Sequence, residues 1–467
     1  LSRFAWWGGR GGGRVAVIVN PLYQTRVLEH QLHDSGARII VILENFATTL
    51  SAIIQDTALE KVVVTKVGDL LGGLKKPLTN FVVKHVKKAV PAYSLPGAID
   101  FSKALQCREP LQPVDVSLDD LAFLQYTGGT TGVAKGAMLS HSNLVHNIQQ
   151  TTAWLPEAFA KTVPVAICAL PLYHIFSLQG NCLAIMKMGG YNVLIPNPRD
   201  MDGFVKELKQ YPFTYFTGVN TLFNGLLNHP EFGNVDFSHL MITLGGGMAV
   251  QRAVAERWQD VTGTPLIQAY GLTETSPGAV INPFVEKQDF TGAIGLPISS
   301  TEVGIFDDDG NELGIGEVGE ICIRGPQVME GYWQRSEETA KVMLDDWLRT
   351  GDIGRMDSDG YVFIEDRKKD MILVSGFNVY PNEIEDVVAQ MDGIIEVAAV
   401  GKPDEKSGEI VKLFVVVDDE SVDQARIISH CRDNLTGYKV PKEIVFKDEL
   451  PKTNVGKILR RELRDNG

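Results

Sequence analysis

A glycine-rich stretch in the first third of the chain has the composition of a phosphate-binding loop. The segment LQYTGGTTGVAKGAML (Leu124–Leu139) holds four glycines, three threonines and one lysine. Small residues allow several backbone N–H groups to point at one anion. A Walker A loop has Ser or Thr after its lysine and a helix directly afterwards, whereas Gly136 follows Lys135 and GAML is typical of a short strand. The stretch therefore predicts a nucleotide site that is not a P-loop.

Two further stretches suit the base and the metal of a nucleotide. LGGGMAV (Leu244–Val250) permits close backbone approach to a flat ligand, and Val250 stands where a dinucleotide fingerprint needs a third glycine. The alternative is a simple tight turn. In YGLTETSP, Tyr270 offers an aromatic face to adenine, and Glu274 offers the oxygen ligands that Mg²⁺ prefers. Its alternative is a turn at a strand end with solvated polar side chains.

Two charged stretches lie nearer the C-terminus. Asp352 in RTGDIG and Arg367 in EDRKKD have the hydrogen-bonding groups that hold the two hydroxyls of a ribose, and the alternative is a salt-bridged β-turn. PKTNVGKILRREL places Lys457 after a glycine, with Arg460 and Arg461 beyond it. Taken alone, such a basic tail is most often solvated surface.

Composition limits the classes of function. The 467 residues are 44% hydrophobic and 22% charged, as in ordinary globular proteins. The net charge of -14 argues against nucleic acid as a partner. The five cysteines are scattered and form no C-x-x-C pair, which predicts reduced thiols and a cytoplasmic protein. No apolar run is long enough to span a bilayer, and no signal peptide is visible.

The order of hydrophobic runs predicts an α/β fold. Val/Ile-rich runs alternate with helix-like stretches, as in VPVAICALP, YPFTYFTGV, HLMITLGGG and PLIQAYG, and this rhythm is typical of a parallel sheet. Ligands gather beyond the carboxyl ends of such strands. We expect a large N-terminal domain over residues 1–367, including a β-rich subdomain at about 295–365, and a small mobile α+β domain over residues 368–467.

Taken together and in this order, the five motifs resemble the adenylate-forming superfamily of acyl-CoA synthetases, luciferases and peptide-synthetase adenylation domains. The segment from Asp345 to Glu385 resembles the fatty-acyl-CoA synthetase signature, and similarity to bacterial long-chain fatty-acid–CoA ligases extends from Asn20 nearly to the end. In this family the large domain begins well before the segment that is Leu1 here. The resemblance therefore implies that the first strands and helices of that domain are missing.

The resemblance implies a two-step reaction that uses ATP, Mg²⁺ and coenzyme A. A fatty carboxylate forms acyl-AMP and pyrophosphate, and the thiol of coenzyme A then displaces AMP. Lys457, Thr273 and Glu274 are the implied catalytic residues, with Glu274 on the metal. The β- and γ-phosphates are assigned to Thr127, Gly128, Gly129, Thr130, Thr131, Gly132 and Lys135. The nucleoside is assigned to Gly245, Gly246, Gly247, Tyr270, Gly271, Asp352 and Arg367.

The remaining implied roles concern movement and the other substrates. Lys369 matches the hinge about which the small domain rotates, Gly376 belongs to a loop that admits the pantetheine arm, and His174 matches the gate of the acyl pocket. A buried structural histidine is the alternative for His174. Rival functions are a fatty-acyl–AMP ligase that feeds a carrier protein, and a ligase for another apolar carboxylic acid. A non-enzymatic nucleotide-binding protein would lack Lys457. The resemblance also allows a homodimer.

A basic stretch predicts reversible contact with the inner face of the cell membrane. From Leu70 to Ile99 there is no Asp or Glu, and residues 71–91 hold five lysines. Within NFVVKHVKKAV, helical spacing places Phe81, Val82, Val86 and Val90 near one face, with lysines largely on the other. The alternative is a helix that packs on the large domain.

Overall fold

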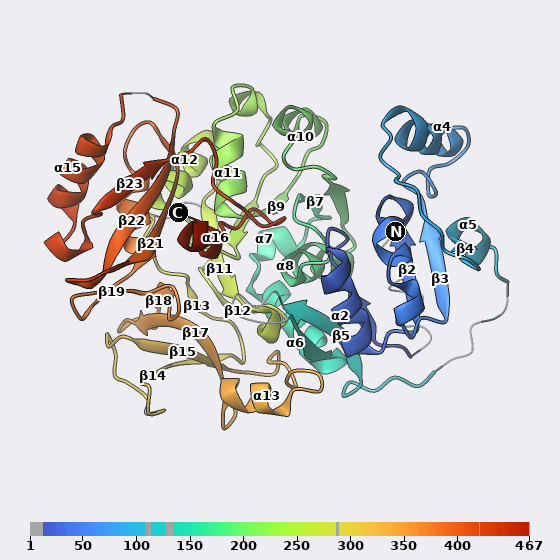
Figure 1. The fold of residues 1–467 in the computed structure, drawn as a ribbon, viewed down its shortest axis with the longest axis horizontal. Helices are drawn as coiled ribbons and strands as arrows, with labels where there is room; N and C mark the ends of the chain where they lie inside the picture. Colours follow the sequence, from blue (N-terminus) through green and yellow to red (C-terminus); the bar gives the residue numbers. More distant parts are fainter. Residues whose placement is uncertain are drawn as a thin grey trace. The chain divides into compact units, whose positions relative to one another are not determined.

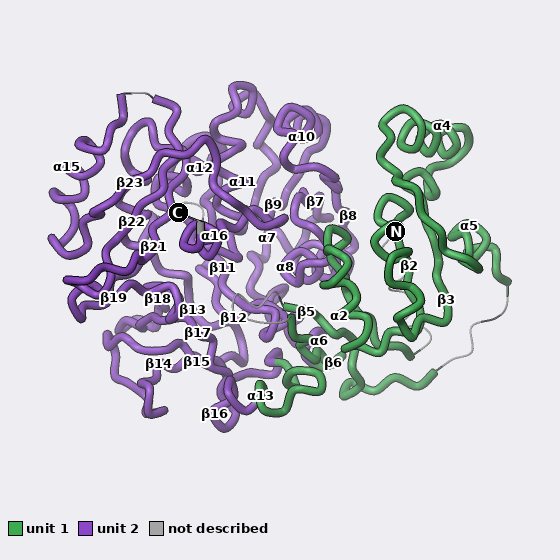
Figure 2. Tube along the Cα trace, viewed as in Figure 1, with its two compact units in different colours: residues 1–142, 329–339 green, residues 143–328, 340–467 purple. Residues whose placement is uncertain are grey.

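The computed structural model describes residues 13–108, 110, 114–127, 134–285, 289–419 and 421–466. Contacts within the chain divide it into two compact units, which Figure 2 colours separately. The first unit holds residues 1–142 and 329–339, and the second holds residues 143–328 and 340–467. The predicted division into domains 1–367 and 368–467 is based on the expected hinge at Lys369 and not on contacts, and it stays a prediction.

The first unit contains two three-stranded sheets. In one, β5 (Leu121–Thr127) lies between β1 (Ala16–Ile18) and β6 (Lys135–Ser140). The other is parallel and has the order β2 (Ile39–Leu43), β3 (Lys61–Thr65), β4 (Ile99–Asp100). The helices of this unit are α2 (Thr25–Ser35), α3 (Ala47–Ser51), α4 (Lys75–Phe81) and α5 (Phe101–Ala104).

The basic stretch of the first unit differs in detail from the predicted helix. α4 ends at Phe81, and one π-helical segment continues it over Val82–Val86. Lys88 then has φ 50°, and the side-chain amide of Asn45 binds the carbonyl oxygen of Ala89 at 2.8 Å. Because this backbone leaves the helix before Val90, only part of the predicted apolar face forms.

A seven-stranded sheet is the centre of the second unit (Figure 1). Its five parallel strands confirm the βα rhythm expected from the sequence. In sheet order they are β8 (Tyr191–Leu194), β7 (Val165–Cys168), β9 (Tyr215–Gly218), β10 (Ile242–Gly246) and β11 (Leu266–Gly271). The antiparallel strands β12 (Gly278–Ile281) and β13 (Leu296–Pro297) complete the edge beside β11.

Helices cover both faces of this sheet because successive strand residues, which point to opposite faces, are both buried. Phe216 of β9 belongs to a core with α10 (Met201–Leu208), α11 (Asn220–Leu227) and α12 (Arg252–Thr262). Its neighbour Tyr215 belongs to a second core with Phe159 of α7 (Glu157–Ala160) and Ile185 of α9 (Ala184–Lys187). The short helix α8 (Ile175–Ser177) precedes α9, and α6 (His141–Trp154) crosses the division between the units.

Two further sheets account for the remainder of the second unit. One antiparallel sheet lies in the region predicted as a β-rich subdomain. Its strands are β14 (Glu302–Phe306), β15 (Gly319–Arg324), β16 (Met343–Leu344), β17 (Trp347–Met356) and β18 (Val362–Arg367). The helix α13 (Ser336–Val342) precedes β16.

The C-terminal sheet contains β19 (Ile372–Val374), β20 (Phe377–Val379), β21 (Ile394–Asp404), β22 (Gly408–Val417) and β23 (Glu443–Phe446). Its helices are α14 (Pro381–Ala389), α15 (Gln424–Asn434) and α16 (Arg460–Asn466). Residues from Ile372 to Ile444 form a hydrophobic core of their own. The predicted α/β class, with a large N-terminal domain and a smaller C-terminal one, is therefore confirmed.

The structure also bears on membrane-spanning helices and on the state of the cysteines. Among the described residues, no helix has the length and the apolar character that a membrane span requires. All five cysteines are free thiols, and four of them are buried.

We predict that Trp258→Ala strongly destabilises the second unit. The Trp258 side chain is fully buried, and its ring centroid lies 4.7 to 5.6 Å from those of Phe216, Phe223 and Phe232. Removing so large a core side chain costs about 3–5 kcal/mol. Chemical denaturation followed by far-UV circular dichroism measures the change, and an unaltered midpoint would contradict this account of the core.

Candidate functional site

Three of the predicted nucleoside residues, from strands β11, β17 and β18, contact one another. The hydroxyl of Tyr270, on β11, donates to Asp352 Oδ2 at 2.6 Å. Asp352 and Arg367 are register partners on β17 and β18, and Arg367 Nε lies 3.4 Å from Asp352 Oδ1. Burial, with the negative charge of Asp352, raises the pKa of Tyr270 well above its usual value, so the phenol stays a donor. The ion pair that was the alternative to ribose binding thus exists between Asp352 and Arg367. It joins two paired strands, β17 and β18, and it lies beside the ring of Tyr270.

Glycine at position 271 allows the chain to turn directly after Tyr270, because the turn leaves no room for a side chain. A Cβ on Gly271 would lie 1.8 Å from the carbonyl oxygen of Pro277. The 3₁₀ turn Thr273–Thr275 follows, and the backbone N–H of Leu272 donates to the hydroxyl of Thr275 at 2.9 Å. This turn leaves Thr273 and Glu274 half-buried and close in sequence to Tyr270.

Lys457 is a half-buried side chain in the same group of residues. Burial, followed by the positive charge of Arg367, lowers the pKa of Lys457 from 10.5 to about 7. Lys369 and Arg460 lower this pKa further, and Asp352 opposes them. The basic tail that sequence alone leaves as solvated surface therefore holds Lys457 in a half-buried position.

A tight loop presents Lys457. The backbone N–H of Lys457 donates to Thr453 Oγ1 at 3.1 Å, and the carbonyl of Lys457 accepts from the N–H of Thr453 at 2.7 Å. On α11, the hydroxyl of Thr221 donates to the carbonyl oxygen of Gly456 at 2.9 Å. Gly456 has φ 84°, and a Cβ there would lie 2.8 Å from Thr221 Oγ1. Glycine thus allows the loop to rest directly on α11.

His174 and Lys369 also lie within electrostatic reach of this group. Burial, together with the positive charge of Lys457, lowers the pKa of His174 to about 4, so its ring is neutral near pH 7. The ring nitrogen Nδ1 accepts from the N–H of Phe176 at 3.4 Å and caps α8. Burial, with the charge of Arg367, lowers the pKa of Lys369. Because cations crowd one buried carboxylate, this region favours an anionic ligand.

The other predicted residues occupy strand ends and turns. Gly245 and Gly246 end β10 beside Gln268 and Ala269 of β11, and Gly247 follows in a left-handed conformation. Gly376, with φ 83°, lies in the turn between β19 and β20, beyond the segment 368–371 that contains Lys369. The assignments of these glycines to the nucleoside and to the pantetheine path stay predictions.

The predicted phosphate residues belong to the first unit. Thr127 ends β5, Lys135 begins β6, and the two are register partners. Lys135 Nζ lies 2.5 Å from Glu338 Oε2 and 4.8 Å from the centroid of the Tyr332 ring, contacts that the loop sequence does not reveal. Gly128, Gly129, Thr130, Thr131 and Gly132 lie outside the described residues.

The described residues contain no group of three or more His, Cys, Asp or Glu side chains placed to hold a metal ion. A single half-buried carboxylate, Glu274, remains as the predicted ligand. Magnesium in nucleotide sites keeps several waters and binds one or two carboxylates plus phosphates, so one carboxylate fits a metal that arrives with its nucleotide.

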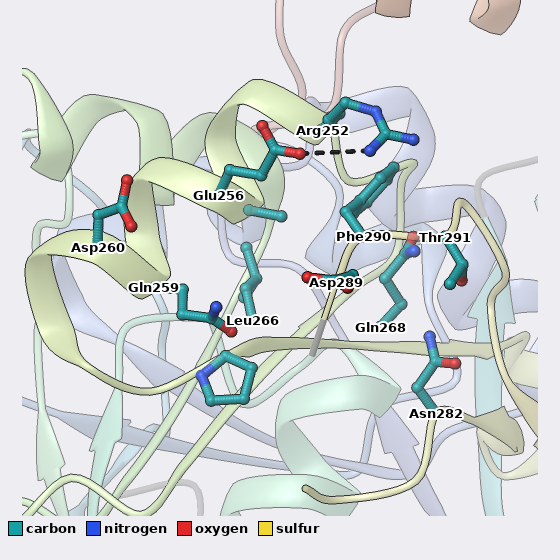
Figure 3. Close-up of a pocket in the computed structure, with 12 residues that line it drawn as sticks. Arg252, Glu256, Gln259, Asp260, Leu266, Gln268, Asn282, Asp289, Phe290 and Thr291 are labelled. Carbon is teal, nitrogen blue, oxygen red and sulfur yellow. Dashed lines mark hydrogen bonds and ion pairs between the residues drawn. The ribbon is translucent and has the colours of Figure 1, made fainter. Parts of the chain in front are cut away.

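A cavity of about 260 Å³ lies apart from these residues, between α12 and β11 (Figure 3). Arg252 and Glu256 form an ion pair along α12 on one side of it, and Gln268 lines it two residues before Tyr270. Because none of the predicted site residues lines it, this cavity is not the candidate site.

Sequence reasoning missed two residues near Lys457: Thr221, which binds the lysine loop, and Arg460, whose charge lowers the pKa of Lys457. Thr221 carries no signal that distinguishes it from other helical threonines. Arg460 belongs to a basic run that is typical of surface, yet its side chain is only 17% exposed, whereas that of Arg461 is 69% exposed. One sequence signal could have indicated that Arg460 is partly buried: a helix begins at Arg460, directly after the lysine loop.

Comparison with known proteins decides the family. The pattern of the AMP-binding enzyme family matches residues 11–333, and that of the AMP-binding enzyme C-terminal domain matches residues 383–457. The chain belongs to the AMP-binding enzyme family. The resemblance noted in the sequence is thereby confirmed.

Individual relatives are similar to this chain over most of its length. The chain is 56% identical to a long-chain-fatty-acid–CoA ligase of Salmonella typhimurium, and the alignment covers 99% of this chain and 82% of that protein. A Bacillus subtilis protein of the same name is 36% identical, with 98% and 82% covered. Among solved structures, ATP-bound MatB of Rhodopseudomonas palustris has a TM-score of 0.81 at 29% identity, covering 99% of this chain and 85% of that one.

We predict that ATP binding at pH 8 takes up close to one proton. The pH then lies about one unit above the pKa of Lys457, so the unliganded side chain is mostly neutral. Phosphate oxygens favour the charged ammonium and raise this pKa. At pH 6 the lysine is already charged, and uptake falls towards zero. Calorimetric titration in buffers of different ionisation enthalpy measures the protons, and Lys457→Gln is the control. Equal uptake by the two proteins would contradict the assignment.

Proposed function

We propose that this chain is a long-chain-fatty-acid–CoA ligase. It activates a fatty acid with ATP to give acyl-AMP and pyrophosphate, and the thiol of coenzyme A then attacks the acyl carbon and releases AMP. The similarity to the Salmonella typhimurium ligase over nearly the whole chain carries the proposal. The grouping of Tyr270, Asp352, Arg367 and Lys457 in one unit supports it.

In this proposal Lys457 stabilises the charge of the first transition state. The attacking carboxylate and the α-phosphate are both anionic, and a cation in a water-poor site is effective against such charge. The crowding of Lys457 by Arg367 and Lys369 supports this role, because an anion between them relieves the repulsion that lowers the lysine pKa. Thr273 and Glu274, on the turn after Tyr270, are the proposed partners for the α-phosphate and the metal.

Nucleoside binding is proposed for the strand-end residues. Asp352 is fixed by Tyr270 and Arg367, and it accepts hydrogen bonds from the ribose hydroxyls in this scheme. Tyr270 and the glycine-rich end of β10, Gly245–Gly247, bracket the adenine. Since the hydroxyl of Tyr270 donates to Asp352, one hydrogen bond orients both subsites.

Magnesium would be held by Glu274 and by the nucleotide phosphates, and it would supply charge neutralisation during attack at phosphorus. The chain's own part is to position the Glu274 carboxylate. The 3₁₀ turn does this, because the hydroxyl of Thr275 ties the backbone of Leu272. Thr127, Lys135 and the loop Gly128–Gly132 are proposed for the β- and γ-phosphates, with Lys135 leaving Glu338 when phosphate is present.

The second half-reaction is proposed to use a different arrangement of the small domain. Lys369 is the hinge, since it lies in the short link between β18 and β19. Gly376, in the β19–β20 turn, borders the path of the pantetheine arm, and His174 gates the acyl pocket. The domain boundary at residues 367 and 368 and the homodimer belong to the same set of proposals.

Membrane contact is proposed for one surface of the first unit, here named the basic apolar surface. Four apolar side chains of α4 and its flanks are 58% to 86% exposed: Leu74, Leu78, Phe81 and Val86. Four exposed lysines accompany them: Lys75, Lys84, Lys87 and Lys88. Apolar side chains that enter the headgroup layer and lysines that meet anionic lipid together suit a peripheral site on the inner face of the cell membrane. Since long-chain fatty acids partition into membranes, docking there brings the enzyme to its substrate.

We predict pyrophosphate release from ATP that depends on a long-chain fatty acid, and acyl-CoA formation when coenzyme A is added. A ladder of fatty acids of increasing length, assayed with and without coenzyme A, makes the measurement. Lys457→Ala should lower adenylation about 10²–10³-fold or more, because it removes a charge donor from the transition state. Transfer from supplied acyl-AMP should remain largely intact.

The outcomes of this assay separate the rivals. Adenylate formation without any thioester on free coenzyme A would indicate a ligase that feeds a carrier protein. Activity only with short or aromatic acids would indicate another apolar substrate. Absence of acid-dependent pyrophosphate release would overturn the proposed function.

We predict that the protein co-sediments with liposomes that contain anionic lipid, and that charge reversal at Lys84, Lys87 and Lys88 releases it. Each lysine near such a surface contributes on the order of 1 kcal/mol, and salt screens the attraction. Leu74→Ser with Leu78→Ser should also weaken binding, because it removes the inserted side chains. A matched control reverses three exposed lysines elsewhere: Lys206, Lys406 and Lys442. Equal loss with the control, or none with either, would refute this surface.

A further inference from the structure

Arg460, three residues after Lys457, lies at the centre of a buried ionic network. Its guanidinium donates to both oxygens of Glu385, from Nε at 3.1 Å and from Nη2 at 2.8 Å. It also donates to Asn382 Oδ1 at 2.7 Å and to Asp366 Oδ1 at 3.3 Å. Although burial alone would lower it, the charges of Glu385 and Asp366 raise the pKa of Arg460 above its usual value. A guanidinium with so many fixed partners has a defined position.

Asp366 differs from the other partners in its place along the chain. It is the next-to-last residue of β18 and lies three residues before the proposed hinge, whereas Asn382, Glu385 and Arg460 all follow that hinge. Asp366 is fully buried, and it accepts from the backbone N–H groups of Arg367 at 2.7 Å and Asn382 at 2.9 Å. Burial raises the pKa of Asp366, and the charge of Arg460 opposes this effect. The carboxylate therefore depends on Arg460 for much of its compensation.

The backbone transmits the position of Arg460 to Lys457. Arg460 is the first residue of α16, and the N–H of Leu459 donates to the carbonyl of Pro451 at 2.8 Å. Lys452 and Ile458 form a bridge that closes the loop around Lys457. Because only two residues separate Lys457 from Arg460, a shift of the guanidinium moves the lysine with it.

We propose that Arg460 and Asp366 form a latch that positions Lys457 for the first half-reaction. The inference rests on the proposed function and adds a positioning pair to it. Rotation about Lys369 carries Arg460, Asn382 and Glu385 together, so their mutual contacts persist in both arrangements. Asp366 stays with the large domain, and its contact with Arg460 belongs to the adenylate-forming arrangement alone. The latch thus favours the state in which Lys457 is in place.

The test compares the two half-reactions in Asp366→Asn. The substitution keeps the shape of the side chain and removes its charge. We expect acid-dependent ATP–pyrophosphate exchange to fall about 10- to 100-fold, the range for a lost charged hydrogen bond. Transfer from supplied acyl-AMP to coenzyme A should stay within about twofold, because that step does not use the latch. Asp366→Glu should recover part of the exchange.

Arg460→Gln and Arg464→Gln provide a matched pair. Both remove a guanidinium from α16, but Arg464 pairs with Asp370 at 3.5 Å, which follows the hinge. Arg464→Gln should leave the ratio of the two half-reaction rates as in the parent, and Arg460→Gln should lower it as Asp366→Asn does. A thermal melt of each variant separates unfolding from misplacement.

The possible outcomes distinguish the latch from the function on which it rests. Equal loss in both half-reactions, or an unchanged ratio in Asp366→Asn, would overturn the latch. A parent protein without acid-dependent exchange would overturn the proposed function instead.

Discussion

The half-buried side chain of Lys457 imposes the constraint on which the rest of the candidate site depends. The positive charges of Arg367, Lys369 and Arg460 lower its pKa, and the negative charge of Asp352 opposes them. A protein interior tolerates such repulsion only where surrounding structure holds the groups in place and where an anion can relieve it. Strand pairing holds Arg367 beside Asp352, and the lysine loop rests on α11 through Thr221. The fold thus maintains positive charge where an anionic substrate would neutralise it.

The large sheet contributes to this site chiefly through its strand ends. Gly246 ends β10, and Tyr270 is the next-to-last residue of the adjacent parallel strand β11, so backbone without side chains and one aromatic ring lie at the same edge. The second sheet supplies Asp352 and Arg367 from strands that pair with each other. Tyr270, Asp352 and Arg367 thus project from strands of sheets that have their own cores, which fixes their positions. The loop after Thr127 contributes to phosphate binding only in the proposal.

Sequence reasoning reached the α/β class, the parallel sheet and the family, because each depends on local patterns that recur along the chain. It also selected Tyr270, Asp352 and Arg367, although spacing alone left an ion pair as the better explanation of the last two. Both descriptions hold, since an ion pair between strands is what fixes Asp352. The role of Arg460 escaped prediction because its partners are 75 to 94 residues away along the chain. The helix near Phe81 was placed correctly, but its end was not, because the contact of Asn45 with Ala89 comes from 44 residues away.

Two kinds of ion pair follow from these contacts, and they serve different ends. The pair of Arg460 with Glu385 joins two residues that both follow Lys369, so the proposed rotation leaves it in place. The pair with Asp366 joins α16 to β18 on opposite sides of Lys369, so in the proposal it belongs to one arrangement only. A buried pair of this second kind contributes little net stability, because desolvation offsets much of its attraction. Its energetic effect is instead a difference between two arrangements of the same chain, which is the quantity that a two-step reaction on a moving domain requires.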